Sequence, residues 1–217
     1  TQFAPQEDFG RYPRDEAGDA AKLASAGCDL MYAPAAAEMY AEGRATSIAV
    51  AGPAEGLCGA ARPQMFGGVA LVVTKLLLQA QPDFAVFGEK DYQQLHVVRR
   101  FVRDLDIPVE IVGLPTVREP DGLAISSRNA YLSPDDRRRA PALQRALAAG
   151  AAVSARGPQA VLDAAGAALA AEPALQVEYL ELADPDLGPD PQVGRARLLA
   201  AARIGGTRLI DNVAVQL

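Results

Sequence analysis

Two short runs of polar residues have the side chains that a phosphate-binding site requires. The first is Gly88-Glu89-Lys90-Asp91, which follows an apolar segment and precedes a segment of helical composition. At a helix N-terminus, backbone amides and the Lys90 ammonium can both face a phosphate, and a carboxylate such as Asp91 can accept hydrogen bonds from ribose hydroxyls. The alternative is that these are ordinary first-turn charges. Lys90 favours the binding site, because a cation at this end of a helix opposes the dipole unless an anion lies beside it.

The second run is Ser126-Ser127-Arg128-Asn129, in a polar stretch between two structured regions. Two hydroxyl groups beside a guanidinium offer several donors to phosphate oxygens, and arginine adds two parallel bonds. Such a run is also typical of a turn that caps a helix. Its place between two predicted domains favours a ligand role, because clefts between domains commonly bind small molecules.

Other polar residues of the first region give weaker signals. Gln93 and Gln94 lie one turn into the predicted helix, where glutamine is usually solvated, although one amide could turn toward a ligand. His96 is the one histidine of the sequence, and its apolar neighbours predict a packed or half-exposed side chain without a catalytic role. With one histidine and two distant cysteines, the sequence offers neither a zinc-ligand cluster nor a Ser-His-Asp triad.

The element that must position Lys90 is a predicted strand-helix-strand unit. Residues 84–88, 89–107 and 108–113 read as strand, helix and strand. The strands are apolar runs without alternation, which predicts a parallel sheet with helices on both faces. Ligands of such sheets bind at the carboxyl ends of the strands, where Lys90 falls.

The residues before this unit predict further α/β structure. Residues 15–27 have helical composition and end in glycine, and residues 65–81 show helical spacing and stop before Pro82. Between these two helices we expect a strand over 28–33, a helical turn over 36–40 and a strand over 45–52.

The composition changes after residue 115, and we place a domain boundary between residues 116 and 120. Beyond it the pattern predicts two helices, 134–154 with Ser133 as its N-cap and 157–171. Three strands should follow, separated in part by a Pro/Gly-rich loop over 184–194, and they are expected to be antiparallel: 175–182, 197–204 and 207–215. The second domain is therefore predicted to be α+β.

Composition restricts the class of protein. At 217 residues, with 50% apolar, the chain can bury a core, and its net charge of −6 with scattered basic residues argues against nucleic acid as a partner. No apolar run reaches the roughly 18 residues of a membrane span. Two cysteines without a signal-peptide pattern predict free thiols and a cytoplasmic location.

Several motifs together resemble the pantothenate synthetase family, also called pantoate–β-alanine ligases. The likeness is carried by FGEKDYQQL, VEIVGLPTVREPDGLAISSRN and YLS, with TQF and RYPRD near the start and TRLIDNVAV near the end. The resemblance implies a Rossmann-like nucleotidyltransferase domain with a parallel sheet at residues 1–117 and a smaller α+β lid domain at 118–217. It also implies a homodimer that uses ATP to join pantoate to β-alanine through pantoyl adenylate, releasing AMP and pyrophosphate.

The resemblance also assigns roles to residues of this sequence. The ATP site would comprise Gly88, Glu89, Lys90, Asp91, Val117, Ile125, Ser126, Ser127 and Arg128. The catalytic set would be Lys90 from the first domain with Ser126, Ser127 and Arg128 from the second, all of which would bind the phosphates. Asp91 would lie near the ribose and Val117 near the adenine. Pantoate would be held by Gln2 and Gln94. Asp19 lies where the family has acidic residues near Mg²⁺, and residues 117–128 would act as a hinge.

Two departures from the family pattern lead to further expectations. The family's His-x-Gly-His phosphate motif lies before the region matched by Gln2, so we expect that the first βα unit is missing from this sequence. Met65 stands where the family has another histidine, within Arg62-Pro63-Gln64-Met65-Phe66. We therefore expect weak ATP binding and very slow turnover. Alternatives are a catalytically impaired relative that binds a nucleotide or pantoate as a regulatory subunit, and a ligase of the same mechanism with another acid or amine.

Overall fold

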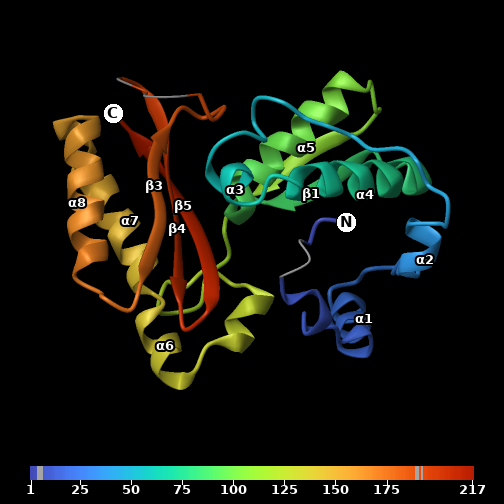
Figure 1. The fold of residues 1–217 in the computed structure, drawn as a ribbon, viewed down its shortest axis with the longest axis horizontal. Helices are drawn as coiled ribbons and strands as arrows, with labels where there is room; N and C mark the ends of the chain where they lie inside the picture. Colours follow the sequence, from blue (N-terminus) through green and yellow to red (C-terminus); the bar gives the residue numbers. More distant parts are fainter. Residues whose placement is uncertain (4–6, 189–190, 192) are drawn as a thin grey trace.

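Two separate β-sheets organise the chain in the computed structural model, which describes residues 1–3, 7–188, 191 and 193–217. In Figure 1 the sheets lie side by side, each with its own helices. A parallel pair is formed by β1 (Phe84–Gly88) and β2 (Glu110–Leu114). An antiparallel sheet is formed by β3 (Gln176–Ala183), β4 (Arg195–Ile204) and β5 (Thr207–Gln216). The predicted combination of a parallel sheet and an antiparallel α+β region is confirmed.

The predicted strand-helix-strand unit is present. Between the two parallel strands lie a 3-10 turn, η2 (Glu89–Asp91), and helix α5 (Tyr92–Asp104). Gly88 at the end of β1 is paired with Leu114 at the end of β2, so η2 begins at the carboxyl edge of the sheet. This connection positions Lys90 at the edge where parallel sheets bind ligands.

Helices cover one face of the parallel pair. The buried side chains of α3 (Leu57–Ala61), α4 (Met65–Ala80) and α5 form a core against which Ala85 and Phe87 of β1 pack. On the other face, Phe84 and Val86 are 62% and 58% exposed. The prediction that both faces are covered is therefore wrong for the described residues, because α4 and α5 pack on the same side.

Two strands predicted in the first 52 residues are not formed. Residues 28–33 and 45–52 have no strand hydrogen bonding, and Leu30 in the first of them is 78% exposed. No described strand lies beside either segment to satisfy its backbone groups, which a strand requires. The predicted helix over 15–27 and the turn over 36–40 are confirmed as α1 (Glu16–Ser25) and α2 (Ala36–Met39).

Helices α7 and α8 cover the antiparallel sheet on its outer side. The predicted helix 134–154 is divided into α6 (Pro134–Arg139) and α7 (Ala142–Ala152), because Pro141 lacks an N–H and disfavours continuation of the helix. Ser133 caps α6 as predicted, since its Oγ accepts a hydrogen bond of 3.1 Å from the amide of Asp136. The second predicted helix is α8 (Pro158–Ala170). Three of the residues in the predicted loop 184–194 lie outside the described residues.

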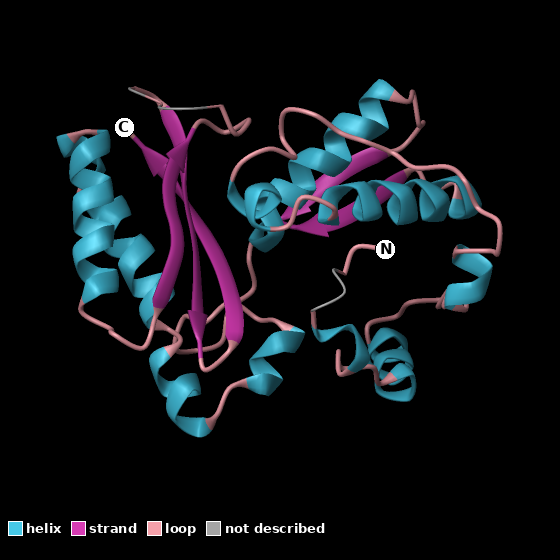
Figure 2. Cartoon of the chain, in the orientation of Figure 1, coloured by secondary structure: helices cyan, strands magenta, loops and turns pink. Residues whose placement is uncertain are grey.

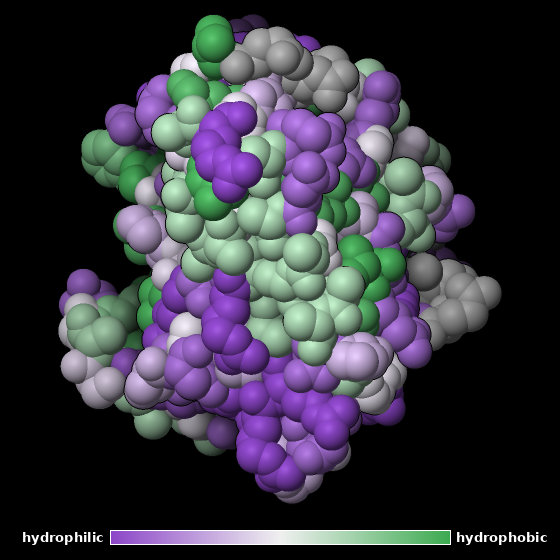
Figure 3. Space-filling view, turned by 90° about the vertical axis from the view of Figure 1, so that its left-hand side faces the viewer, coloured by the Kyte–Doolittle hydropathy of each residue, from purple (hydrophilic) through white to green (hydrophobic). Residues whose placement is uncertain are grey.

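Small side chains dominate the outer face of this region. Figure 3 shows a broad area of weakly hydrophobic residues there, with hydrophilic residues above and below it. Figure 2 shows how α7 and α8 leave the opposite face of the sheet directed toward the parallel pair. In the described part of the chain, none of the helices has the length and apolar character needed to cross a membrane.

Candidate functional site

A cavity of about 1030 Å³ lies between the first half of the chain, residues 1–117, and the second half, residues 118–217. Its walls come from residues 1–3 and 7–12, the segment 58–69, the start of α5, residues 125–131 and strands β3, β4 and β5. We call it the central cavity. It is large enough for a ligand of nucleotide size.

Lys90 reaches the central cavity from the 3-10 turn η2. Its side chain is 19% exposed, and its Nζ lies 3.7 Å from Oδ2 of Asp91, which also lines the cavity. Because Asp91 is 47% exposed and the separation is long, this is a weak pair that leaves the ammonium able to bind an anion.

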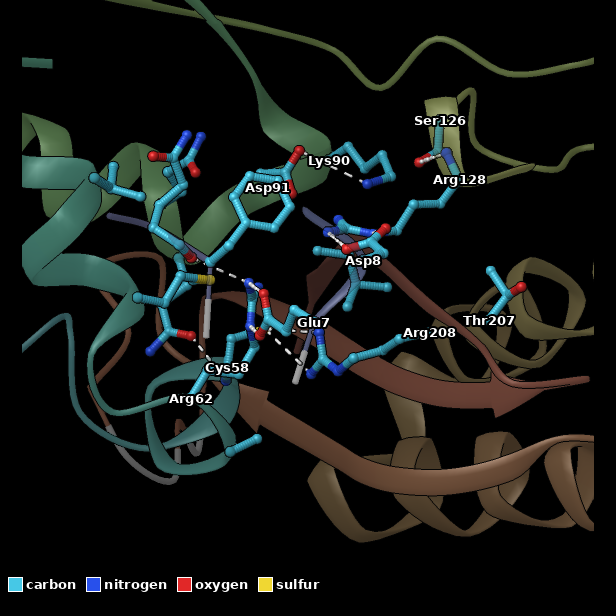
Figure 4. Close-up of a pocket in the computed structure, with 18 of the residues that line it drawn as sticks. Glu7, Asp8, Cys58, Arg62, Lys90, Asp91, Ser126, Arg128, Thr207 and Arg208 are labelled. Carbon is cyan, nitrogen blue, oxygen red and sulfur yellow. Dashed lines mark hydrogen bonds and ion pairs between the residues drawn. The ribbon is translucent and has the colours of Figure 1, made fainter. Parts of the chain in front are cut away.

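The second predicted run lies across the cavity from Lys90. Ser126 caps the 3-10 helix η3 (Ser127–Tyr131) by accepting a 3.3 Å hydrogen bond from the amide of Arg128. The interpretation as a capped turn is confirmed. Ser126, Ser127 and Arg128 also line the cavity, and their binding of phosphate stays a prediction. In Figure 4 the side chains of Lys90 and Arg128 extend toward the same region, with Asp8 beside Arg128.

Asp8 forms an ion pair with the guanidinium of Arg128. Nε and Nη2 of Arg128 each donate a 2.9 Å hydrogen bond to one carboxylate oxygen of Asp8. These bonds hold the pKa of Asp8 below its usual range and raise the pKa of Arg128. Tyr12 adds a cation–π contact, its ring centroid lying 5.4 Å from Cζ of Arg128, and its hydroxyl accepts a 2.7 Å hydrogen bond from Ser127. Asp8 and Tyr12 thus contact the second half of the chain at the wall of the cavity.

The pair predicts a pH-dependent contribution to stability. A carboxyl group with a lowered folded pKa stabilises the fold above its unfolded pKa of about 3.9 and loses that contribution as the pH falls through the folded value. Replacing Asp8 by asparagine should lower the free energy of unfolding by about 1–2 kcal/mol at neutral pH. Urea unfolding of both proteins should show this difference disappearing as the solution is acidified below the folded pKa.

The matched control for that prediction is Asp121→Asn. Asp121 also pairs with an arginine, Arg137, but its side chain is 44% exposed, so solvent screens the pair and its loss should matter less. An equal cost for both substitutions at neutral pH, or a cost of Asp8→Asn that persists in acid, would contradict the assigned origin.

Arg62 is neutralised in the same way as Arg128. Its Nε and Nη2 both donate to the carboxylate of Glu7, and Nη2 also donates to the carbonyl of Gln2 at 3.3 Å. Met65 lines the same wall. It is the residue that stands where the family pattern has a histidine. Sequence reasoning missed Glu7 and Asp8, because the arginines that they contact lie 55 and 120 residues away in the sequence.

A further basic group comes from the antiparallel sheet. Arg208 donates from Nη1 and Nη2 to Sγ of Cys58 at 3.5 and 3.4 Å and from Nε to Glu178 at 2.7 Å. Tyr179 lies 3.3 Å from the same sulfur, and burial raises the pKa of its hydroxyl. Basic side chains from both halves thus line the cavity of a chain whose net charge is −6: Arg11, Arg62, Lys90, Arg128, Arg203 and Arg208. Four acidic residues line the same cavity, Glu7, Asp8, Asp91 and Asp211, so basic groups exceed acidic ones, which suits an anionic ligand.

The remaining predicted residues divide into two groups. Gln2, Gln94 and Ile125 line the central cavity, whereas these four do not: Gly88, Glu89, Val117 and Asp19. Glu89 instead forms a 3.0 Å ion pair with Arg197, and Val117 is 68% exposed. Gln93 also lines the cavity, but it is buried and its amide bonds to the backbone of residues 53–58. Gln94 is therefore the member of the pair that stays a predicted ligand contact.

The predicted metal ligand is separate from this site. Asp19 lies on α1, is 60% exposed and pairs with Lys22 at 3.3 Å. Throughout the described ranges, no three His, Cys, Asp or Glu side chains come together as a metal site. The protein side chains that are described therefore do not form a Mg²⁺ site by themselves, and the role of Asp19 stays a prediction.

Two minor structural expectations are confirmed, the packing of His96 and the free thiols. His96 is half-buried, its ring centroid lies 4.5 Å from that of Tyr92, and burial lowers its pKa. Cys28 and Cys58 are free thiols, the first exposed and the second buried.

Comparisons with known proteins give a consistent result. The sequence model of the Pantoate-beta-alanine ligase family matches residues 1–214. The pantothenate synthetase of Caulobacter vibrioides is 59% identical over 224 residues, covering 99% of this chain and 78% of that protein. The corresponding protein of Mycolicibacterium smegmatis is 50% identical over 216 residues, covering 100% of this chain and 69% of that protein.

Solved structures agree with the sequence matches. The crystal structure of pantothenate synthetase from Thermus thermophilus is similar with a TM-score of 0.94 and 52% identity, covering 98% of this chain and 79% of that one. The pantoate-beta-alanine ligase from Francisella tularensis, complexed with beta-gamma ATP and beta-alanine, has a TM-score of 0.78 and 30% identity, covering 98% of this chain and 75% of that one.

Proposed function

Since this chain belongs to the pantoate–β-alanine ligase family, we propose that it joins pantoate to β-alanine at the expense of ATP, through a pantoyl-adenylate intermediate. It is an enzyme of the ligase type. The observation that carries the proposal is the central cavity itself, which Lys90 and Arg128 enter from the two halves of the chain.

The first step needs charge neutralisation more than acid–base catalysis. A carboxylate oxygen of pantoate forms a bond to the α-phosphorus of ATP, and the bond from that phosphorus to the bridging oxygen breaks to release pyrophosphate. Both reactants are anions, so positioned cations lower the barrier by stabilising the charge of the transition state. Lys90 and Arg128 would supply this charge from opposite walls, and the hydroxyls of Ser126 and Ser127 would add donors.

In the second step the neutral amine of β-alanine attacks the acyl carbon of the adenylate. A carbon–nitrogen bond forms, the carbon–oxygen bond to AMP breaks, and one proton is released. The main task of the protein here is to keep water away from the adenylate. Residues 117–128 would close the cavity as a hinge, and the division into residues 1–117 and 118–217 is part of this proposal.

The other contacts follow from the positions of the side chains. Gln2 and Gln94 line the cavity and would hold pantoate through its hydroxyls and carboxylate. Asp91 would accept from the ribose, next to the backbone of Gly88 and Glu89. The amide of Ile125 donates to the carbonyl of Val117 at 3.0 Å, which would keep Val117 near the adenine.

Some features of the proposal lie outside the cavity. Mg²⁺ would enter with the phosphates of ATP, which is its usual manner of binding, because the described side chains do not form a site for it by themselves. A homodimer and a cytoplasmic location are proposed from the family alone.

The test is pyrophosphate exchange into ATP, measured with pantoate and with other hydroxy acids. We expect exchange to rise at least about tenfold when pantoate is added, because adenylate formation requires the acid. Exchange that another acid stimulates and pantoate does not would assign a different substrate, which Met65 in the cavity wall would then explain. ATP binding without exchange for any acid would identify a binding relative instead of a working ligase.

A further inference from the structure

Asn212 of β5 is bonded to the turn that carries Lys90. It is 4% exposed, and its Nδ2 donates hydrogen bonds of 2.9 Å to the carbonyl oxygens of both Glu89 and Lys90. Strand β5 belongs to the antiparallel sheet, and the turn η2 follows β1 of the parallel pair. These two bonds therefore join the two sheets at the edge of the central cavity.

The orientation of the Asn212 amide is fixed by Arg197 of β4. Nε of Arg197 donates to Oδ1 of Asn212 at 2.6 Å, so the amide nitrogen must face the two carbonyls. Arg197 is itself held, because Nη2 donates to Glu89 at 3.0 Å and its guanidinium lies 4.2 Å from the ring centroid of Tyr92. The amide therefore has one arrangement that satisfies all of its partners.

The position of the Lys90 backbone matters for its side chain. The ammonium is at the end of a flexible four-carbon chain, and the three-residue turn that carries it has no side-chain cap. A displacement of about 1 Å in a positioning contact can cost on the order of 100-fold in rate. The two hydrogen bonds from the buried Asn212 amide fix the position of the Lys90 backbone relative to the second half of the chain. The second half also carries Arg128.

We propose that Asn212 is a positioning residue for ligand binding, which acts by holding the backbone of Lys90 at the edge of the cavity. The inference rests on the proposed function, in which Lys90 binds the phosphates of ATP. Asn212 also lines the cavity. A direct contact with the ligand would therefore be felt with or without the Lys90 ammonium, whereas a positioning effect should pass through Lys90.

The experiment is a double-mutant cycle read out by the dissociation constant for ATP. Asn212→Leu keeps most of the side-chain volume and removes both donors without adding a charge, and Asn212→Ala removes the whole amide. Each should weaken ATP binding roughly tenfold. In a Lys90→Met background, the same changes should alter the dissociation constant less than about twofold, because the ammonium that they position is gone.

The matched control is Val215→Ala on the same strand. Val215 is 6% exposed, packs in the helix-covered core of the second half and does not line the cavity. It should lower the melting temperature as much as the Asn212 variants do, while ATP binding stays unchanged. A loss of binding in Val215→Ala equal to that in Asn212→Ala would overturn the inference, since general destabilisation would explain both.

Two further outcomes are decisive. If Lys90→Met weakens binding and neither Asn212 variant does, or if the effects multiply in the double variants, the positioning role is wrong while the proposed function stands. If Lys90→Met binds ATP as tightly as the unchanged chain, the proposed function fails, and the positioning role fails with it.

Discussion

Replacing Lys90 by methionine should weaken the binding of ATP roughly 30- to 140-fold, the largest effect expected of any single change in the cavity. The substitution keeps most of the length of the side chain and removes only the ammonium. A hydrogen bond to a charged group contributes about 2–3 kcal/mol where water is partly excluded, and each 1.4 kcal/mol corresponds to a factor of ten. Lys90 meets that condition, since 19% of its side chain is exposed and its contact to Asp91 is long.

Isothermal titration with ATP measures this loss directly. The control is Lys75→Met, which removes a lysine from α4, outside the residues that line the central cavity. It should leave the dissociation constant within about twofold of the unchanged chain. Similar affinities for the two variants would mean that Lys90 does not contact the phosphates, and the assignment of the ATP site would have to be abandoned.

The parts of the fold that were predictable are those set by local signals. The strand-helix-strand unit from Phe84 to Leu114 follows from the type and length of its apolar runs, and Ser133 was recognisable as a cap from its place before Pro134. Pro141 should have ended the predicted helix 134–154, but the charged residues before it and the alanine-rich residues after it all favour a helix. The helix propensities of the residues around Pro141 do not show the helix break that the proline itself causes.

Sheet pairing was less predictable, because it depends on partners elsewhere in the chain. Residues 28–33 and 45–52 have apolar, β-branched or aromatic residues, but no described strand lies beside them. Ile48 and Val50 still pack against the core of α4 and α5, so burial of side chains was predicted better than backbone pairing. Phe84 and Val86 show the same difficulty. Their apolar side chains predicted a helix packed against that face of the sheet, and the described residues do not supply one.

In the site, the cations were predictable and their partners were not. Lys90 and Arg128 stand in short motifs, whereas the contact between Arg128 and Asp8 joins residues 120 apart in sequence, and that between Arg62 and Glu7 joins residues 55 apart. No local pattern records such contacts. They matter because an arginine already bonded to a carboxylate must exchange that partner before it can bind a phosphate.

This exchange distinguishes Arg128 from Lys90 in energetic terms. To bind the phosphates of ATP, the guanidinium would have to give up two 2.9 Å bonds to Asp8, which would offset part of the new interaction. Lys90 gives up only a 3.7 Å contact to Asp91. Arg128→Gln should therefore weaken ATP binding by roughly 10- to 30-fold, about 1.4–2 kcal/mol, which is less than the loss for Lys90→Met.

The geometry of the arginine gives a second, independent expectation. Arg128→Lys keeps the charge but loses the planar fork that can bind two phosphate oxygens at once, so its affinity for ATP should fall between those of the unchanged chain and Arg128→Gln. Arg137→Gln is the matched control, because it breaks an arginine–aspartate pair in the same half of the chain but outside the cavity. If Arg128→Gln bound ATP as tightly as Arg137→Gln, Arg128 would be only a partner of Asp8. A loss larger than that of Lys90→Met would show that Asp8 does not compete with the phosphates, since the offset would then be absent.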